Sequence, residues 1–143
     1  MTENSTDDPS APQRIVAIED KPFWDAIDAG NFVVAHCPCG ACYLRSQTCL
    51  QCRSSADSLR WTAASRNATV RTFVVFDKPY HPYFEGRLPY VVGVVSLQEG
   101  PEMITNVVGC NVETLSIGQA VEIIIAERGG QKIHQATVRS EPQ

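Results

Sequence analysis

Short runs of alternating apolar and polar residues fill the chain from residue 69 onward. Val121, Ile123 and Ile125 show this period of two most clearly, with Glu122 between the first two. Such alternation is typical of strands with one buried face. Runs rich in Val, Ile, Thr and Phe predict five strands, at 69–76, 89–97, 103–108, 120–126 and 132–138.

Turn residues separate these strands, at 99–101, 117–118 and 128–130. A longer break at 111–116 lies between the third and fourth strands. Five short strands with this spacing favour a small Greek-key barrel of the OB type. An SH3-like barrel and a five-stranded sandwich are the alternatives, because a strand pattern alone does not determine the order of strands in a sheet.

The first half of the chain has a different pattern. Residues 1–13 are polar and acidic without apolar periodicity, and we expect a disordered tail over 1–18. Residues 20–30 predict a short helix, with Asp20 as cap, Pro22 in the first turn and Gly30 past the end. Its apolar residues share one stripe, which must pack against another part of the chain or another protein: Phe23, Trp24 and Ile27.

Two further short strands, at 32–35 and 59–62, flank a cysteine-rich segment. Strand, knuckle, knuckle and strand in this order predict a zinc ribbon. We therefore expect an all-β protein with three parts: a tail (1–18), a short helix with a rubredoxin-like zinc ribbon (19–63), and a five-stranded OB-fold barrel (64–143).

Five of the six cysteines lie within residues 36–52. They form two C-x-x-C pairs, Cys39 with Cys42 and Cys49 with Cys52. Two such pairs can supply the four thiolates of a tetrahedral Zn²⁺ site, with bonds of about 2.3 Å. We prefer this interpretation to disulfides or free thiols, and a redox C-x-x-C would require a βαβ pattern that the sequence lacks. A four-ligand site has no open position for substrate, so we expect structural zinc.

The fourth ligand is the open question at this site. Cys39, Cys49 and Cys52 are the fixed members. Local chelate geometry favours Cys42, whereas Gly40 suits a turn in which Cys39 is the second ligand and Cys37 the first. His36 is a third candidate.

Composition and charge restrict the function. The net charge is −4, and no apolar run approaches the eighteen or so residues that span a bilayer. We expect a cytoplasmic protein that binds no membrane, where reduced thiols agree with zinc. Residues 45–87 carry seven basic and three acidic residues, which suits either a phosphate-bearing ligand or a solvated surface. Nucleic-acid binding requires a net basic footprint, which the chain does not have.

The connection between the first two predicted barrel strands, residues 78–88, is rich in aromatic residues. Loops seldom expose so many, which predicts a contact surface or a pocket wall. The alternative is that the loop folds over the barrel and fills its opening. We expect the partner or substrate-channel surface to combine this loop with the helix: Phe23, Trp24, Tyr80, His81, Tyr83, Phe84 and Arg87.

The order of helix, cysteine ribbon and barrel resembles a family of zinc-ribbon/OB-fold proteins, long catalogued as a domain of unknown function. The similarity runs from about residue 21 to 138 and is strongest in FWDAIDAGNF, the ribbon, LPYVVGVVSLQEGPEMITNVVGC and SIGQAVEI. The resemblance implies an accessory subunit that forms a hetero-oligomer with a thiolase-like or lipid-transfer-protein-like enzyme acting on acyl-CoA thioesters. Steroid side-chain-cleaving aldolases and thiolase/acyltransferase complexes are examples.

In that family the ribbon reads C-x-x-C-G, about ten residues, then C-x-x-C. Aligned on this pattern, Cys37 takes the place of the first ligand and Cys39 with Gly40 that of the C-G. This chain is one residue shorter in the first knuckle and one shorter in the loop. The resemblance therefore supports Cys37 as the fourth ligand.

The sequence offers no catalytic constellation. His36, His81 and His134 have no nucleophile or acid in a motif, and Cys110 lacks the motifs of a thiolase nucleophile. We therefore expect no catalysis by the chain alone, and no catalytic residue is assigned. The alternative functions are a nucleic-acid-binding zinc-ribbon/OB-fold protein and a rubredoxin-like electron carrier.

Overall fold

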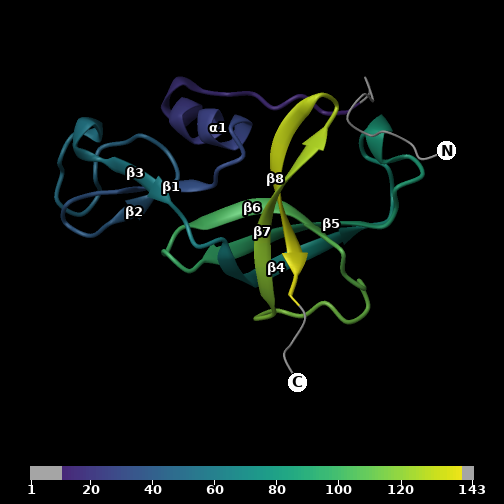
Figure 1. Cartoon of the computed structure of the whole chain (residues 1–143). Coiled ribbons are helices and arrows are strands. Elements are labelled where there is room, and N and C mark those ends of the chain that lie inside the picture. Colours follow the sequence, from purple (N-terminus) through teal and green to yellow (C-terminus); the bar gives the residue numbers. More distant parts are fainter. Residues whose placement is uncertain (1–10, 140–143) are drawn as a thin grey trace.

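The computed structural model describes residues 11–139, which form a small three-stranded sheet, one α-helix and a closed β-barrel (Figure 1). The strands are β1 (Val33–His36), β2 (Cys42–Tyr43), β3 (Arg60–Ala63), β4 (Asn67–Phe76), β5 (Tyr90–Leu97), β6 (Glu102–Val108), β7 (Ala120–Arg128) and β8 (Gln131–Val138). The α-helix is α1 (Lys21–Asp28), and three 3₁₀ turns are η2 (Ile18–Asp20), η3 (Ala56–Ser58) and η4 (Pro82–Phe84).

The barrel has the strand order β4-β5-β6-β8-β7 and closes through β4 and β7. Its neighbours are antiparallel except β6 and β8, which are parallel. This order and this single parallel pair are those of an OB fold, so the predicted fold class is confirmed. The five predicted strands correspond to β4–β8, with ends within two residues of the prediction.

The cysteine segment forms the second sheet, with order β2-β1-β3. β1 and β3 are the two predicted flanking strands. β2 was not predicted, because two residues are too few for a period of two to be visible. It pairs Cys42 with His36 and Tyr43 with Ala35, and so sets which side of the ribbon each of its side chains faces.

Of the two predicted end signals of helix α1, one is found and one is not. Gly30 has φ +84°, the left-handed conformation predicted past the helix end. Asp20, however, makes no capping hydrogen bond, because its carboxylate accepts two hydrogen bonds from the Arg45 guanidinium, at 2.9 and 3.0 Å. That prediction is wrong, since the ion pair occupies the oxygens a cap would need.

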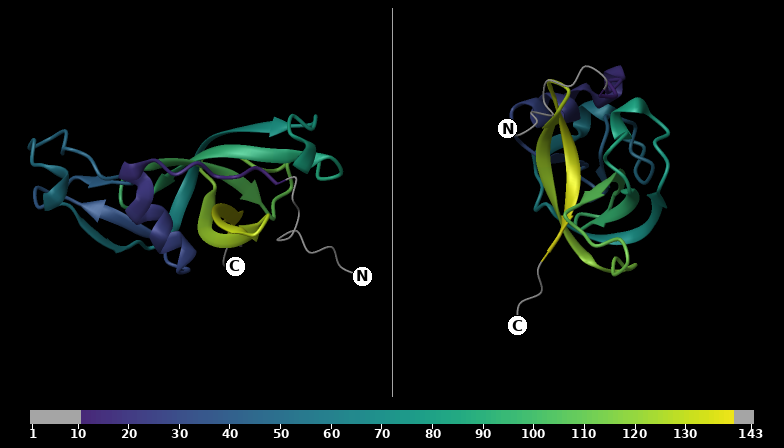
Figure 2. Two further views of the ribbon diagram at one scale, coloured as in Figure 1. Left: turned by 90° about the horizontal axis from the view of Figure 1, so that it is seen from above. Right: turned by 90° about the vertical axis from the view of Figure 1, so that its right-hand side faces the viewer.

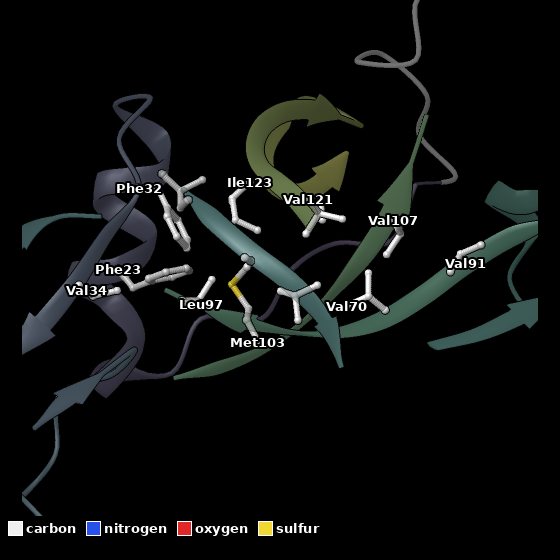
Figure 3. Close-up of a cluster of buried hydrophobic side chains, with 14 of the residues drawn as sticks. Phe23, Phe32, Val34, Val70, Val91, Leu97, Met103, Val107, Val121 and Ile123 are labelled. Atoms are coloured by element: carbon white, nitrogen blue, oxygen red, sulfur yellow. The ribbon is translucent and has the colours of Figure 1, made fainter. Parts of the chain in front are cut away.

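One hydrophobic core runs through the helix, the ribbon and the barrel (Figure 3). Phe23 and Ile27 of α1 and Phe32 and Val34 of the ribbon lie in the same cluster as the inward residues of the barrel. The Phe23 and Phe32 ring centroids are 5.9 Å apart. The helix stripe thus packs within the chain, against residues on both sides of the predicted boundary at 63/64.

Figure 2 shows the resulting arrangement, with the ribbon at one end, the barrel at the other and α1 between them. Of the predicted tail, residues 1–10 lie outside the described part. Residues 11–17 have no helix or strand, yet Ala11 is buried and Arg14 pairs with Asp28 at 2.7 Å and donates to the Lys132 carbonyl. The expectation of disorder is wrong for this segment. No described helix is long and apolar enough to cross a membrane.

His134 on β8 marks the junction of helix and barrel. Its ring stacks on Trp24, with centroids 5.4 Å apart, and meets the edge of Phe23. The Thr105 hydroxyl donates to the His134 carbonyl at 3.1 Å, which leaves its oxygen to accept from the ring Nδ1 at 2.8 Å. Burial, with a smaller contribution from nearby Arg128, lowers the pKa of His134 to about 4.

This burial predicts a pH-dependent stability. Because the folded pKa lies below the unfolded value of about 6.5, the unfolded chain gains a proton first as the pH falls, and stability is lost between about pH 6.5 and 4. His134→Gln should remove up to about 3 kcal/mol of this dependence, measured by urea unfolding at a series of pH values. If the free energy of unfolding changed with pH by the same slope in the variant and the natural chain, this prediction would be wrong.

Candidate metal centre and interaction surface

Four thiols meet at the tip of the ribbon. The Sγ atoms of Cys37, Cys39, Cys49 and Cys52 all lie within 4.8 Å of one another. The Cys37–Cys52 and Cys39–Cys49 sulfur pairs are each 3.5 Å apart. Sulfurs around a tetrahedral ion with bonds of about 2.3 Å are about 3.8 Å apart, so one ion fits at the centre. No disulfide is formed among these cysteines.

Two tight turns place these sulfurs. In the first, the Gly40 amide donates to the Cys37 carbonyl at 2.8 Å, and Gly40 has φ +104°, which glycine adopts without strain. In the second, the amides of Gln51 and Cys52 both donate to the Cys49 sulfur at 3.4 Å. Amide donors of this kind stabilise a thiolate, and therefore a metal-bound sulfur.

Tyr43 of β2 holds the second turn. Its hydroxyl donates to the Cys49 sulfur at 3.4 Å and accepts from the Leu50 amide at 2.8 Å. This hydroxyl is the main cause that lowers the pKa of Cys49 to about 5. The Ser54 hydroxyl likewise lowers the pKa of Cys52. The second turn is therefore prepared to present thiolates, which are the form that binds metal.

The other two ligand candidates lie outside the cluster. Cys42 is half-buried and packs against the shared core, and burial raises the pKa of its thiol. The His36 ring nitrogen Nδ1 lies 2.9 Å from the Thr62 hydroxyl. Of the alternatives left open by the sequence, Cys37 is thus the residue that joins Cys39, Cys49 and Cys52. Four sulfur ligands leave no coordination position for a substrate.

The β4–β5 loop, residues 77–89, is folded onto itself. Tyr83 is buried, with 7% of its surface exposed. The prediction that its ring is an exposed anchor is therefore wrong. The Arg87 guanidinium covers its ring, 4.0 Å from the centroid. The His81 ring accepts from the Tyr83 amide at 3.1 Å and begins η4. His81 and Arg87 therefore brace the loop.

The remaining aromatic residues of the loop join a row of rings on β4 and β5. Phe84 stacks on Tyr90 with centroids 3.9 Å apart, Tyr90 stacks on Phe76 at 4.9 Å, and the Tyr80 ring meets Phe76 edge-on at 5.6 Å. Tyr80 is 71% exposed. The row is accessible at that end.

Next to this row, the outward side of the barrel is apolar over three strands. Val74, Val92, Val94 and Ile104 form this outer apolar face; Val74 is opposite Val92, and Val94 is opposite Ile104. Directly opposed residues share one side of a sheet. Ile104 is 68% and Val74 55% exposed. Sequence reasoning missed this face, although the unbroken apolar run 91–95 was a signal that both sides of β5 are apolar.

The helix does not contribute to that surface. Phe23 is buried, with 5% of its surface exposed, because it fills the shared core, so its prediction as a docking residue is wrong. Trp24 is half-buried between His134 and the Arg14 guanidinium. In Figures 1 and 2, α1 and the β4–β5 loop lie on opposite sides of the β7–β8 hairpin.

A cavity of about 300 Å³ opens beside the aromatic row, between the β4–β5 loop and the β7–β8 hairpin. Cys110 lies in its wall, where burial raises the pKa of the thiol. No histidine or acid is among the described residues that line the cavity. The wall thus contains no base to activate this sulfur.

Comparison with known proteins agrees with this architecture. Residues 61–125 match the family model described as "ChsH2, C-terminal OB-fold domain". A solved structure titled "Ltp2-ChsH2(DUF35) aldolase" superposes with a TM-score of 0.78 over 88% of this chain and 98% of that one, at 24% identity. This superposition supports the same fold.

Two relatives have a higher sequence identity to this chain than that solved structure has. A "Probable enoyl-CoA hydratase alpha subunit" of Thermomonospora curvata is 32% identical over 124 residues, which are 84% of this chain and 38% of the relative. A "DUF35 domain-containing scaffold protein" of Methanothermobacter thermautotrophicus is 28% identical over 89 residues, which are 60% of this chain and 64% of the relative. The chain thus spans under two thirds of the length of these relatives.

A short helix, a four-cysteine ribbon and an OB barrel in one chain define the class of this protein. The predicted resemblance is confirmed: the chain is similar to ChsH2 in its C-terminal OB-fold domain and to the DUF35 scaffold proteins.

The cluster predicts which thiols bind a metal. Cys37→Ser should abolish the ligand-to-metal charge-transfer bands of a tetrahedral Co²⁺–thiolate complex, because it removes one of four ligands, whereas the matched Cys42→Ser variant should keep them. Absorption during Co²⁺ titration of each reduced protein measures this difference. Retention of the full spectrum by Cys37→Ser, or its loss in Cys42→Ser, would show a different ligand set.

Proposed function

We propose that this protein is an accessory subunit of a cytoplasmic hetero-oligomeric enzyme, in which it docks on a thiolase-superfamily subunit that acts on acyl-CoA thioesters. A side-chain-cleaving aldolase or a thiolase/acyltransferase complex is the expected type. The scaffold relatives and the aldolase whose fold it shares support this role. The observation that carries it is the outer apolar face, which an unpartnered protein has no reason to expose.

Structural Zn²⁺ is part of the proposal. Thiolate sulfurs are soft ligands, and a tetrahedral set of four suits Zn²⁺. Cys37, Cys39, Cys49 and Cys52 would hold the ion, with Tyr43 orienting Cys49. The ion would hold the two turns together where the ribbon tip has only a small core of its own, formed by Ala35, Ala41 and Leu59 with two of the cysteines.

Several features support an accessory role in place of catalysis. The contacts of the three histidines in residues 11–139 are of the kind that stabilise a fold. His36 contacts Thr62, His81 accepts from a backbone amide, and His134 is buried against aromatic rings with a low pKa. The chemistry is therefore assigned to the partner subunit.

The proposed docking surface is the outer apolar face together with the exposed end of the aromatic row. Central apolar and aromatic side chains supply most of the binding energy where proteins meet, and polar residues surround them. The Arg71–Glu102 ion pair, at 3.0 Å, belongs to such a rim, because Glu102 lies two residues before Ile104 on β6 and so on the same side of the sheet. Tyr80 extends the surface toward the loop.

The chain offers a matched pair of variants to test this surface. Ile104 on the outer apolar face and Ile117 in the β6–β7 connection are equally exposed, at 68% and 69%. Ile104→Glu should weaken the complex with a co-expressed thiolase-superfamily enzyme of the same organism at least tenfold, since a central contact contributes about 2 kcal/mol. Ile117→Glu should not. Calorimetric titration of the purified partners measures both affinities.

Two results would contradict the proposal in different ways. If no thiolase-superfamily enzyme of the organism co-elutes with the natural chain in size-exclusion chromatography, the accessory function is wrong. If a complex forms but both isoleucine variants bind alike, the function stands and the docking surface lies elsewhere. Thermal melting of the free variants controls for their folding.

A further inference from the structure

The cavity beside the aromatic row lies where OB folds place ligands. Counted along the barrel, its walls come from the first and last hairpin connections and from the second and third strands, the region that OB folds use for binding. It holds about 300 Å³, the lower end of the range for small-molecule pockets. Its lining comes from the β4–β5 loop, the segment after β6 and the β7–β8 hairpin.

The polar part of the lining is cationic. Arg87 and Arg128 both line the cavity, and no Asp or Glu is among its described lining residues. Arg128 donates to the Asn106 amide oxygen at 2.9 Å, and this bond holds its guanidinium over the cavity side of β6. Within residues 11–139, Arg128 forms no ion pair with a carboxylate.

Two aromatic rings hold Arg128 from the other side. Its Cζ lies 5.4 Å from the Tyr83 ring centroid and 5.8 Å from that of Phe84. Burial, together with the nearby Arg87 charge, lowers the pKa of Arg128. A half-buried cation beside a second cation raises the free energy of the empty site, and an anion placed there would offset that cost.

The rest of the lining is apolar. Val107, Val108, Val112 and Pro89 contribute aliphatic surface, and the stacked pair Phe84 and Tyr90 contributes aromatic surface. A hydrated inorganic anion gains nothing from such walls. A ligand that joins a negative charge to a flat hydrocarbon body satisfies both parts of the cavity.

We propose that this cavity binds a small organic acid, with its carboxylate on the Arg128 guanidinium and its planar apolar body against Phe84 and Tyr90. The planar guanidinium matches a carboxylate through two parallel hydrogen bonds. The Gln135 amide, also in the lining, supplies a further polar contact for a substituent. The site is separate from the four-cysteine centre and requires no partner subunit.

The test uses the full chain and the probe 2-naphthoate, with the uncharged 2-naphthamide as its matched ligand control. Titration followed by ¹H–¹⁵N NMR should give saturable shifts at residues of the cavity with naphthoate and at least tenfold weaker binding of naphthamide. Arg128→Gln should weaken naphthoate binding at least tenfold. Arg60→Gln, which removes an exposed arginine from β3, should leave it unchanged.

Three outcomes would overturn the proposal. Equal binding of naphthoate and naphthamide would show that charge is not recognised, and this comparison needs only the natural chain. Undiminished binding to a folded Arg128→Gln protein would remove the assigned residue. Shifts with inorganic phosphate but none with naphthoate would make the cavity a simple anion site. Because the isolated chain is measured, none of these results depends on whether a partner enzyme binds.

Discussion

The contact between α1 and the two sheets is the constraint on which the rest of the structure depends. Phe23 and Ile27 meet Phe32 and Val34 of the ribbon and the inward residues of the barrel in one core. A ribbon of three short strands buries too little apolar area to be stable alone. The helix supplies the missing apolar contact at one end of the ribbon, and the four thiols gather at the other. The orientation of the ribbon is therefore set by packing, and its tip is formed by the four-cysteine cluster.

The sequence predicts the barrel well because each strand buries one side. A slip of one residue would turn every inward valine outward, so a period of two determines both the strands and their faces. Predictions failed where a long-range ion pair replaced a local interaction. Asp20 is a residue type that often caps a helix, but its carboxylate pairs with Arg45 instead. Arg14 pairs with Asp28 of α1 and donates to the Lys132 carbonyl of β8, which holds a polar segment in place although its composition is typical of disorder. Neither ion pair has a local sequence signal.

The choice between Cys37 and Cys42 shows the same limit of sequence reasoning at the four-cysteine cluster. C-x-x-C spacing favoured Cys42, yet β2 places Cys42 opposite His36 and Tyr43 opposite Ala35. Neighbouring residues of a strand point to opposite sides. Tyr43 faces the centre and donates to Cys49, so Cys42 must face the shared core. Two residues of strand thus decide between Cys37 and Cys42. Spacing alone cannot show them. The family register pointed to Cys37 because it aligned Gly40, whose positive φ closes the first turn.

The inward and outward side chains of β5 and β6 have different roles. Their inward side chains, Val91, Val95 and Val107 among them, close the barrel core, while their outward side chains form the outer apolar face and the rim of the cavity. Gly93 shows how tightly the inward side is filled, since a Cβ there would lie 2.9 Å from the Val107 side chain. At Gly93 the inward side thus has no room for a ligand, and only its end at Val91 and Val107 borders the cavity. The outer apolar face and the cationic cavity adjoin through Tyr90 and Asn106, so the proposed partner and the proposed acid would bind on neighbouring surfaces.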